Sequence, residues 1–151
     1  MRRKLYDESV KVAVGTHHPA ADLTDVSLSD LLEFPWILPG TRTVLRREIE
    51  EYFEHHSMTM PQNRVEATSF LTVRQLLSDM DVVAILPGSI ARDDSRLTTL
   101  PIVLGNIGHR VGMTLAADRA LSPGGNALMG KLIEAGRHMS QSDTSHEEPM
   151  H

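Results

Sequence analysis

The spacing of apolar side chains along the chain predicts several short strands. Between residues 10 and 14, three valines alternate with Lys11 and Ala13, which is the two-residue period of a half-buried strand. Residues 82–86 are continuously apolar between Asp81 and Pro87, and such a run is typical of a strand buried on both faces in a parallel sheet. Other apolar or alternating runs predict extended segments at 36–38, 63–67, 97–103 and 110–117.

Apolar residues at helical spacing predict helices between these strands. The clearest helix covers about 43–56, where Leu45, Ile49 and Phe53 recur on one face. A second helix begins at Thr68 or Ser69, either of which can cap it, and runs to about residue 79. A helical turn at 27–32, a short segment around residue 90 and a helix that opens at the Ser-Pro pair 122–123 complete the pattern. The alternation of strands and helices favours an α/β fold with a parallel sheet and right-handed crossovers.

This arrangement places a candidate binding site at the carboxyl ends of the strands. Ligands of open α/β sheets bind beyond those ends, where loops and helix N-termini leave backbone N–H groups unpaired. Three turns occupy such positions, at residues 38–41, 67–69 and 86–89. Their Thr and Ser hydroxyls could donate to a small oxyanion, and the helix dipoles would add to the attraction. Simple helix capping is the alternative, and it is favoured for any one of these residues taken alone.

Positive charge gathers at the start of the helix predicted at 43–56. Arg42, Arg46 and Arg47 lie there, whereas the glutamates lie toward its end, and the helix dipole favours the opposite arrangement. Pairs at i, i+4, Arg46 with Glu50 and Arg47 with Glu51, partly offset this reversal. The arginines could attract anions, but a charged face that is merely solvated is the favoured interpretation.

The composition excludes several classes of function. With 151 residues the chain can build one core, and its 15 Lys and Arg against 20 Asp and Glu give a charge of −5, which disfavours DNA binding by the chain itself. The lack of cysteine excludes disulfides and thiolate chemistry and suits a reducing cytoplasm. Charged residues interrupt any signal-peptide core, and no run approaches the ~20 apolar residues of a membrane span. We therefore expect a soluble, cytoplasmic protein without membrane contact.

Sequence motifs for catalysis and metal binding are missing. The histidines include the adjacent pairs 17–18 and 55–56, but neighbours on a strand point to opposite faces, and no H-x-x-x-H spacing occurs. The sequence contains no P-loop, G-x-S-x-G or G-x-G-x-x-G motif. We expect no metal, no cofactor and no enzymatic activity.

The order of several short motifs resembles the effector-binding domain of LysR-type transcriptional regulators. The strand at 10–14 leads to His18-Pro19-Ala20, which is similar to a His-Pro-Leu-Ala turn of that family. Residues 35–39 (PWILP), the strand that ends in Leu86-Pro87, and residues 119–123 (RALSP) before the last helix resemble later steps of the same domain. With residues 5–8 and 27–31, these motifs extend the resemblance over about 5–138.

The resemblance implies a type 2 periplasmic-binding-protein-like fold, in which two α/β lobes joined by two crossover strands hold a small effector. Residues 1–9 would be a lead-in and 10–139 a partial effector domain. Within that domain 10–14 and 110–117 would be the crossovers, about 23–104 the second lobe and about 122–138 the C-terminal helix. Residues 140–151 would form a disordered tail.

The family's N-terminal winged helix-turn-helix and the start of the first lobe have no counterpart in this sequence. We therefore expect a fragment, a truncated reading frame or a gene remnant, with DNA contact only through an absent N-terminal module. The apolar stripe of the last helix would pack on the missing lobe in the family. We expect that stripe to be exposed or to mediate self-association.

By this resemblance the chain senses a small metabolite, for which we expect a carboxylate, and modulates transcription as a homo-oligomer or by pairing with a full-length regulator. The implied effector-binding residues lie in the three turns selected above or directly after them and are Gly40, Thr41, Arg42, Thr68, Ser69, Phe70, Leu86, Pro87 and Gly88. The alternative is a stand-alone small-molecule-binding or oligomerisation domain that pairs with full-length regulators. An enzyme on the same scaffold is disfavoured, because fold does not dictate function and no acid–base constellation is visible.

Overall fold

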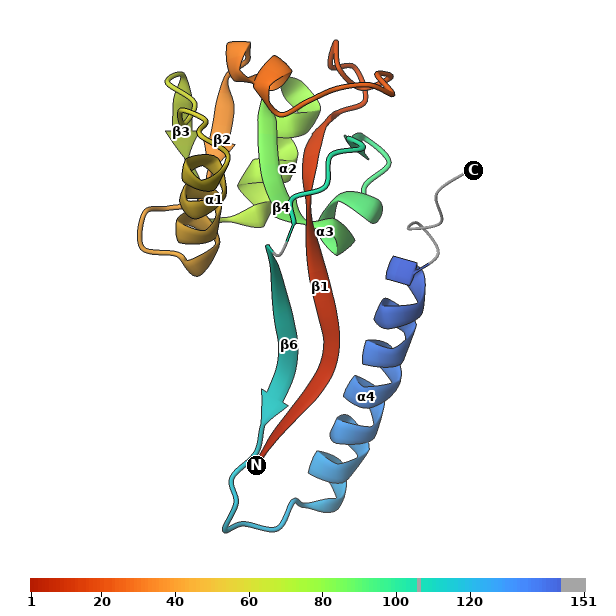
Figure 1. Ribbon diagram of the computed structural model, residues 1–151. Coiled ribbons are helices and arrows are strands. Elements are labelled where there is room, and N and C mark those ends of the chain that lie inside the picture. The colour runs from red at the N-terminus through yellow and green to blue at the C-terminus, as the bar shows by residue number, and fades with distance from the viewer. Residues whose placement is uncertain (106, 145–151) are drawn as a thin grey trace. The chain divides into compact units, whose positions relative to one another are not determined.

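The computed structural model describes residues 1–105 and 107–144 (Figure 1). Its strands are β1 (Arg2–Gly15), β2 (Trp36–Leu38), β3 (Arg64–Glu66), β4 (Val83–Pro87), β5 (Leu97–Thr99) and β6 (Gly108–Thr114). Its helices are the 3-10 helix η1 (Ser29–Glu33), α1 (Val44–His55), α2 (Phe70–Asp79), α3 (Gly88–Arg92) and α4 (Pro123–Thr144). The chain divides into two compact units, which we call the sheet unit (Val10–Ile107) and the ribbon unit (Met1–Ser9 with the described residues from Gly108 onward).

The sheet unit contains a mixed sheet with the strand order β3-β2-β4-β1-β5. β2 is parallel to β3 and to β4, whereas β1 is antiparallel to β4 and to β5. The prediction of a parallel sheet is therefore correct for three strands and wrong for β1 and β5. A continuous apolar run such as that of β4 reports burial of both faces, which β4 has, but it does not report the direction of the neighbouring strands.

Helices cover both faces of this sheet, because successive side chains of a strand point to opposite faces. Trp36 of β2 packs in a cluster with Phe53 of α1. Ile37, the next residue, packs in a second cluster with Leu77 of α2. The rings of Trp36 and Phe53 meet edge-on, with centroids 6.0 Å apart, and Trp36 Nε1 donates a hydrogen bond to the carbonyl of Leu31 at 2.9 Å. The sheet with its two helical layers positions the turns at the strand ends.

The ribbon unit consists of two antiparallel strands and one long helix. β6 pairs with the first part of β1, starting with Arg2 opposite Thr114, and Leu5 forms a bulge in this pairing. Helix α4 approaches the ribbon closely at Gly136. A Cβ atom at this position would lie 3.0 Å from Leu5 Cβ and 3.1 Å from Leu5 O, so glycine permits the approach. In the predicted apolar stripe of α4, Leu128 is exposed, whereas Ile133 is half-buried.

Several observed boundaries differ from the predicted ones. Residues 2–9, expected as a lead-in, belong to β1, because pairing with β6 extends the strand. Residues 140–144, expected in a disordered tail, continue α4, and residues 145–151 lie outside the described residues. β6 covers 108–114 rather than 110–117, and β5 ends at residue 99, before Pro101, which has no N–H for a strand pairing. In the described part of the chain, no helix has the length and apolar character that crossing a membrane requires.

Candidate functional site

Three turns meet at one edge of the sheet. β2 lies between β3 and β4 and is parallel to both, so the carboxyl ends of the three strands lie at the same edge. Residues 39–43 join β2 to α1, residues 67–69 join β3 to α2, and α3 begins directly after β4. All nine residues predicted as the effector site belong to these turns or to the strand and helix ends beside them. The sheet therefore brings together segments that lie up to about 50 positions apart in the sequence.

A cavity of about 80 Å³ lies between these turns. β2 lines it with its last two residues, and β4 with Ile85 and Leu86. Thr68 and Phe70 also line the cavity and are exposed, whereas Leu86 is fully buried, so the cavity leads from the surface toward the core. The other six predicted residues lie in the same turns but do not line it: Gly40, Thr41, Arg42, Ser69, Pro87 and Gly88.

Gly40 allows the turn after β2 to lie against the turn after β3. A Cβ atom at position 40 would lie only 2.9 Å from Thr68 Cγ2, which is closer than carbon atoms approach without displacement. Any side chain at this position would push Thr68 aside. The glycine thus couples the two turns through a close contact rather than through a hydrogen bond.

Helix caps fix the ends of the two turns. The Thr43 hydroxyl accepts a hydrogen bond from Arg46 N at 3.2 Å and donates one to Gly40 O at 2.8 Å, so it caps α1 and also closes the preceding turn. Ser69 Oγ accepts from Thr72 N at 3.5 Å and caps α2. Of the two caps expected for α2, Ser69 and Thr68, Ser69 is the one observed. Capping therefore orients both helix N-termini toward the sheet edge.

The buried side chain of Arg46 binds the turn at residues 39–43. Its side chain is only 4% exposed, its Nε donates to Glu50 at 2.7 Å, and its Nη1 donates to Pro39 O at 2.9 Å and to Glu66 at 3.2 Å. The interpretation of a solvated charged face is therefore wrong for Arg46, although Arg42 and Arg47 are exposed. The helical period places Arg46 beside the buried residues of α1, and its long side chain reaches the ends of β2 and β3. Arg46 thereby connects two of the three turns.

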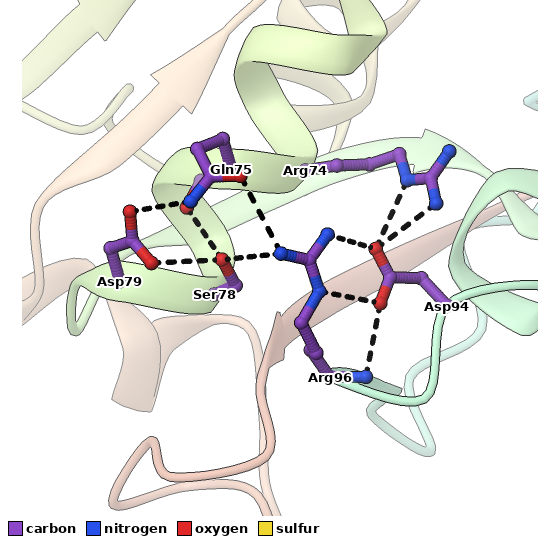
Figure 2. A network of polar contacts seen from close by, with 6 residues as sticks. All are labelled: Arg74, Gln75, Ser78, Asp79, Asp94 and Arg96. Atoms are coloured by element: carbon purple, nitrogen blue, oxygen red, sulfur yellow. Dashed lines mark hydrogen bonds and ion pairs between the residues drawn. The ribbon is translucent and has the colours of Figure 1, made fainter.

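A polar network ties α2 to the turn before β5 (Figure 2). The buried carboxylate of Asp94 accepts hydrogen bonds from Nε, Nη2 and the backbone N–H of Arg96 at 2.8 to 3.0 Å, and from Arg74 Nε at 3.1 Å. Arg96 Nη1 also reaches Gln75 and Ser78 on α2, each at 3.5 Å. The bonds from Arg96, reinforced by Arg74, hold the pKa of Asp94 well below its usual range. This network keeps α2, and with it the turn at 67–69, in place.

A second hollow, of about 570 Å³, lies against the outer surface of α1. Its lining includes Glu48, Glu51 and Tyr52 of the helix and Val103 of the segment after β5. None of the predicted site residues lines it, and two carboxylates oppose the binding of an anion there. In the described part of the chain, no three His, Asp or Glu side chains come together so that they could hold a metal ion.

Sequence reasoning missed the apolar lining of the cavity. Leu45 was recognised only as a core position of the first helix, and Val73 lies in the second predicted helix, yet both line the cavity as well as the core. Their position in the first turn of each helix is the available signal, because residues there lie beside the strand ends. The role of Thr43 could have been found from its place just before the apolar stripe of α1, which is that of an N-cap.

Comparison with known proteins defines the class of this fold. Among solved structures, the regulatory domain of CcmR from Synechocystis PCC6803 in complex with 2-PG matches with a TM-score of 0.68 and 17% identity, over 92% of this chain and 68% of that one. The effector-binding domain of QuiR in complex with shikimate matches with a TM-score of 0.64 and 18% identity, over 91% of this chain and 66% of that one. The fold is that of the effector-binding domains, of type 2 periplasmic-binding-protein character.

The family follows from the sequence match. The model of the LysR substrate binding domain matches residues 2–137, and the chain therefore belongs to this family. The HTH-type transcriptional regulator PcaQ of Agrobacterium fabrum is 28% identical over 134 residues, which are 87% of this chain and 43% of PcaQ. The chain thus spans less than half the length of the curated relative that it matches. The resemblance and the fold class inferred from the sequence are confirmed.

Proposed function

We propose that this chain is the effector-sensing part of a LysR-type transcriptional regulator. A small anionic metabolite, a carboxylate in our proposal, binds at the carboxyl ends of β3, β2 and β4. It contacts the nine residues selected from the sequence and shifts the balance between two arrangements of the lobes. The ligand can shift that balance only by its difference in affinity for the two arrangements. The chain acts without enzymatic activity and in the cytoplasm.

One observation carries this proposal. The three turns that the sequence selected come together at one sheet edge around a cavity, in a chain whose family is that of LysR substrate binding domains. The N-termini of α1 and α2 both begin at this edge and present N–H groups without partners in the helix. The small ligands 2-PG and shikimate in the complexes of the CcmR and QuiR domains support a small-molecule site in this fold.

Calorimetric titration with small carboxylic acids tests the site. Thr41→Ala should weaken binding of the best acid about fivefold, the effect of one lost hydrogen bond, whereas Thr59→Ala, an exchange of another exposed threonine, should have no effect. Ser69→Asp retains a helix cap but places a negative charge beside the ligand, so it should abolish binding while α2 stays folded. Unchanged binding in Thr41→Ala and in Ser69→Asp would remove the site assignment.

DNA binding and oligomerisation involve more than these residues in our proposal. The net charge of −5 disfavours DNA binding by this chain. We assign DNA binding to a separate helix-turn-helix module of the regulator. We propose that the regulator acts as an oligomer. Two hypotheses were drawn from the sequence: a domain that only binds a small molecule, and a domain that pairs with full-length regulators. Size-exclusion chromatography of this chain mixed with a full-length regulator distinguishes them. A domain that only binds small molecules should not form mixed oligomers, whereas a pairing domain should.

A further inference from the structure

We propose that the effector carries a compact, branched alkyl group that enters the cavity between β2, β4 and α2, while its acidic group stays at the cavity mouth. This inference rests on the proposed function, because it specifies the ligand class of the same site. The lining of the cavity, its volume and the position of its polar groups carry the argument.

The interior of the cavity offers almost no hydrogen-bonding partners. Apart from Thr43 and Thr68, every side chain of the lining is apolar. The hydroxyl of Thr43 is already engaged, because it donates to Gly40 O and accepts from Arg46 N. A buried water needs two to four polar partners, and a polar ligand group has a similar requirement. The interior therefore suits an alkyl group better than it suits water or the acidic end of a ligand.

The volume of the cavity restricts the size of that group. The cavity measures about 80 Å³. An apolar cavity of roughly 150 Å³ accommodates benzene, so the space here fits an isopropyl or isobutyl group and is too small for a phenyl ring. A compact branched group keeps more of its carbon atoms inside so small a space than a linear chain with the same number of carbons, and close contact with the lining is the condition for a gain in dispersion energy.

The polar groups that could hold the acid lie at the mouth. Thr68 is exposed, and Ser69 beside it caps α2, whose first N–H groups have no backbone partner within the helix. Phe70, which is 41% exposed, flanks the same opening, whereas Leu86 at the inner end is fully buried. A carboxylate at the mouth therefore keeps donors and solvent while its alkyl group leaves water. Each buried CH₂ group should strengthen binding about fourfold.

Methyl-detected NMR titration of the whole chain tests the inference with three probe acids. Acetate has the acidic group alone, 3-methylbutanoate adds a branched alkyl group of fitting size, and benzoate adds a ring that exceeds the cavity. We expect 3-methylbutanoate to bind at least about tenfold tighter than acetate and tighter than benzoate. It should shift the methyl signals of Val73, Ile85 and Leu86. Ala67→Leu, which places a larger side chain in the lining, should reduce the preference for 3-methylbutanoate over acetate.

Ala21→Leu is the matched control, because Ala21 is also half-buried but lies outside the cavity lining, and it should retain the preference. Xenon provides a measurement on the unaltered chain, and it should shift the same methyl signals. If acetate binds as tightly as 3-methylbutanoate, or if xenon leaves these signals unmoved, the inference is wrong while the acid site of the proposed function stands. If xenon shifts the signals but none of the acids binds, the proposed acid site is wrong and the inference, which rests on it, falls as well.

Discussion

The sheet unit and the ribbon unit differ in the amount of apolar surface that each buries by itself. In the described part of the chain, every fully buried large apolar side chain lies between Val10 and Leu104, within the sheet unit. The ribbon unit has two strands and one helix, and its Leu128 and Leu132 are 61% and 40% exposed. Two-stranded ribbons have little stability of their own. The candidate site thus belongs to the unit with a complete core, which can hold the three turns in a fixed geometry.

The sharpest test of this difference removes a large side chain from each unit. Phe53→Ala, on the buried face of α1 against Trp36, should lower the free energy of unfolding by about 3–5 kcal/mol, because it leaves a cavity. Leu128→Ala, on the exposed face of α4, should change it by less than about 0.5 kcal/mol. Urea denaturation followed by far-ultraviolet circular dichroism measures both losses, because the helices of both units contribute to that signal. Similar losses in the two variants would show that the ribbon unit has a core of its own.

The network around Asp94 gives the next largest expected effect. Asp94→Asn should destabilise the sheet unit by about 2–3 kcal/mol, because the charged partner of two arginines is lost. The pKa of Asp94 is lowered in the folded state, so its contribution is present above the unfolded-state pKa of about 3.9 and is lost as the pH falls below that value. Urea denaturation at pH 7 and at pH 3 measures this contribution. The difference in free energy of unfolding between wild type and Asp94→Asn should be smaller at pH 3 than at pH 7. Asp93→Asn, at the neighbouring exposed position, is the control, and its free energy of unfolding should equal that of wild type at both pH values.

The elements of the sheet unit could be predicted well because each depends on local pattern. β2 was predicted with its observed bounds, and Ser69 was identified as a possible cap of α2. The direction of β1 could not be predicted, since strand pairing depends on partners that lie about 70 positions away in the sequence. The same holds for Arg46: its sequence pattern suggests a surface charge, and only the folded sheet brings Pro39 and Glu66 to it.

For the candidate site, too, the local features could be predicted from the sequence and the long-range packing could not. Sequence reasoning selected the three turns, because strand ends and helix starts have recognisable residues such as those of Ala67-Thr68-Ser69. It could not predict the cavity, whose lining depends on how the side chains of four elements pack together. In the ribbon unit the prediction failed for residues 2–9, because polar residues there form a strand through pairing with β6 rather than through their own pattern.

A smaller, pH-dependent effect should come from His18 of the sheet unit. The ring is buried against Phe34, and its Nδ1 accepts a hydrogen bond from Ala20 N at 3.0 Å. Among the described residues, its Nε2 has no hydrogen-bond partner. Burial lowers the pKa of His18, with nearby Asp81 opposing this shift. The unfolded chain therefore binds more protons below about pH 6.5, and stability should fall as the pH decreases from that value.

His18→Asn removes this titration while an amide oxygen can still accept the hydrogen bond from Ala20 N. Melting temperatures at pH 7.5, 6.5 and 5.5 should therefore decline less steeply in His18→Asn than in wild type. A wild-type slope in His18→Asn would show that His18 does not govern stability in this range.

The smallest expected effects separate packing from helix propensity within the ribbon unit. Gly130 lies on α4, and beyond the neighbouring helix backbone no atom of the described residues lies within 4 Å of an added Cβ. Gly130→Ala should therefore stabilise the helix by about 0.5–1 kcal/mol through its propensity alone. Gly136→Ala gains the same propensity, but its Cβ would meet Leu5 at 3.0 Å, so the helix must shift away from β1. Hydrogen exchange of the α4 amides should slow in the first variant and quicken in the second. If both variants slow the exchange, contact with Leu5 does not stabilise α4, and the ribbon unit is held together even more weakly than its exposed leucines indicate.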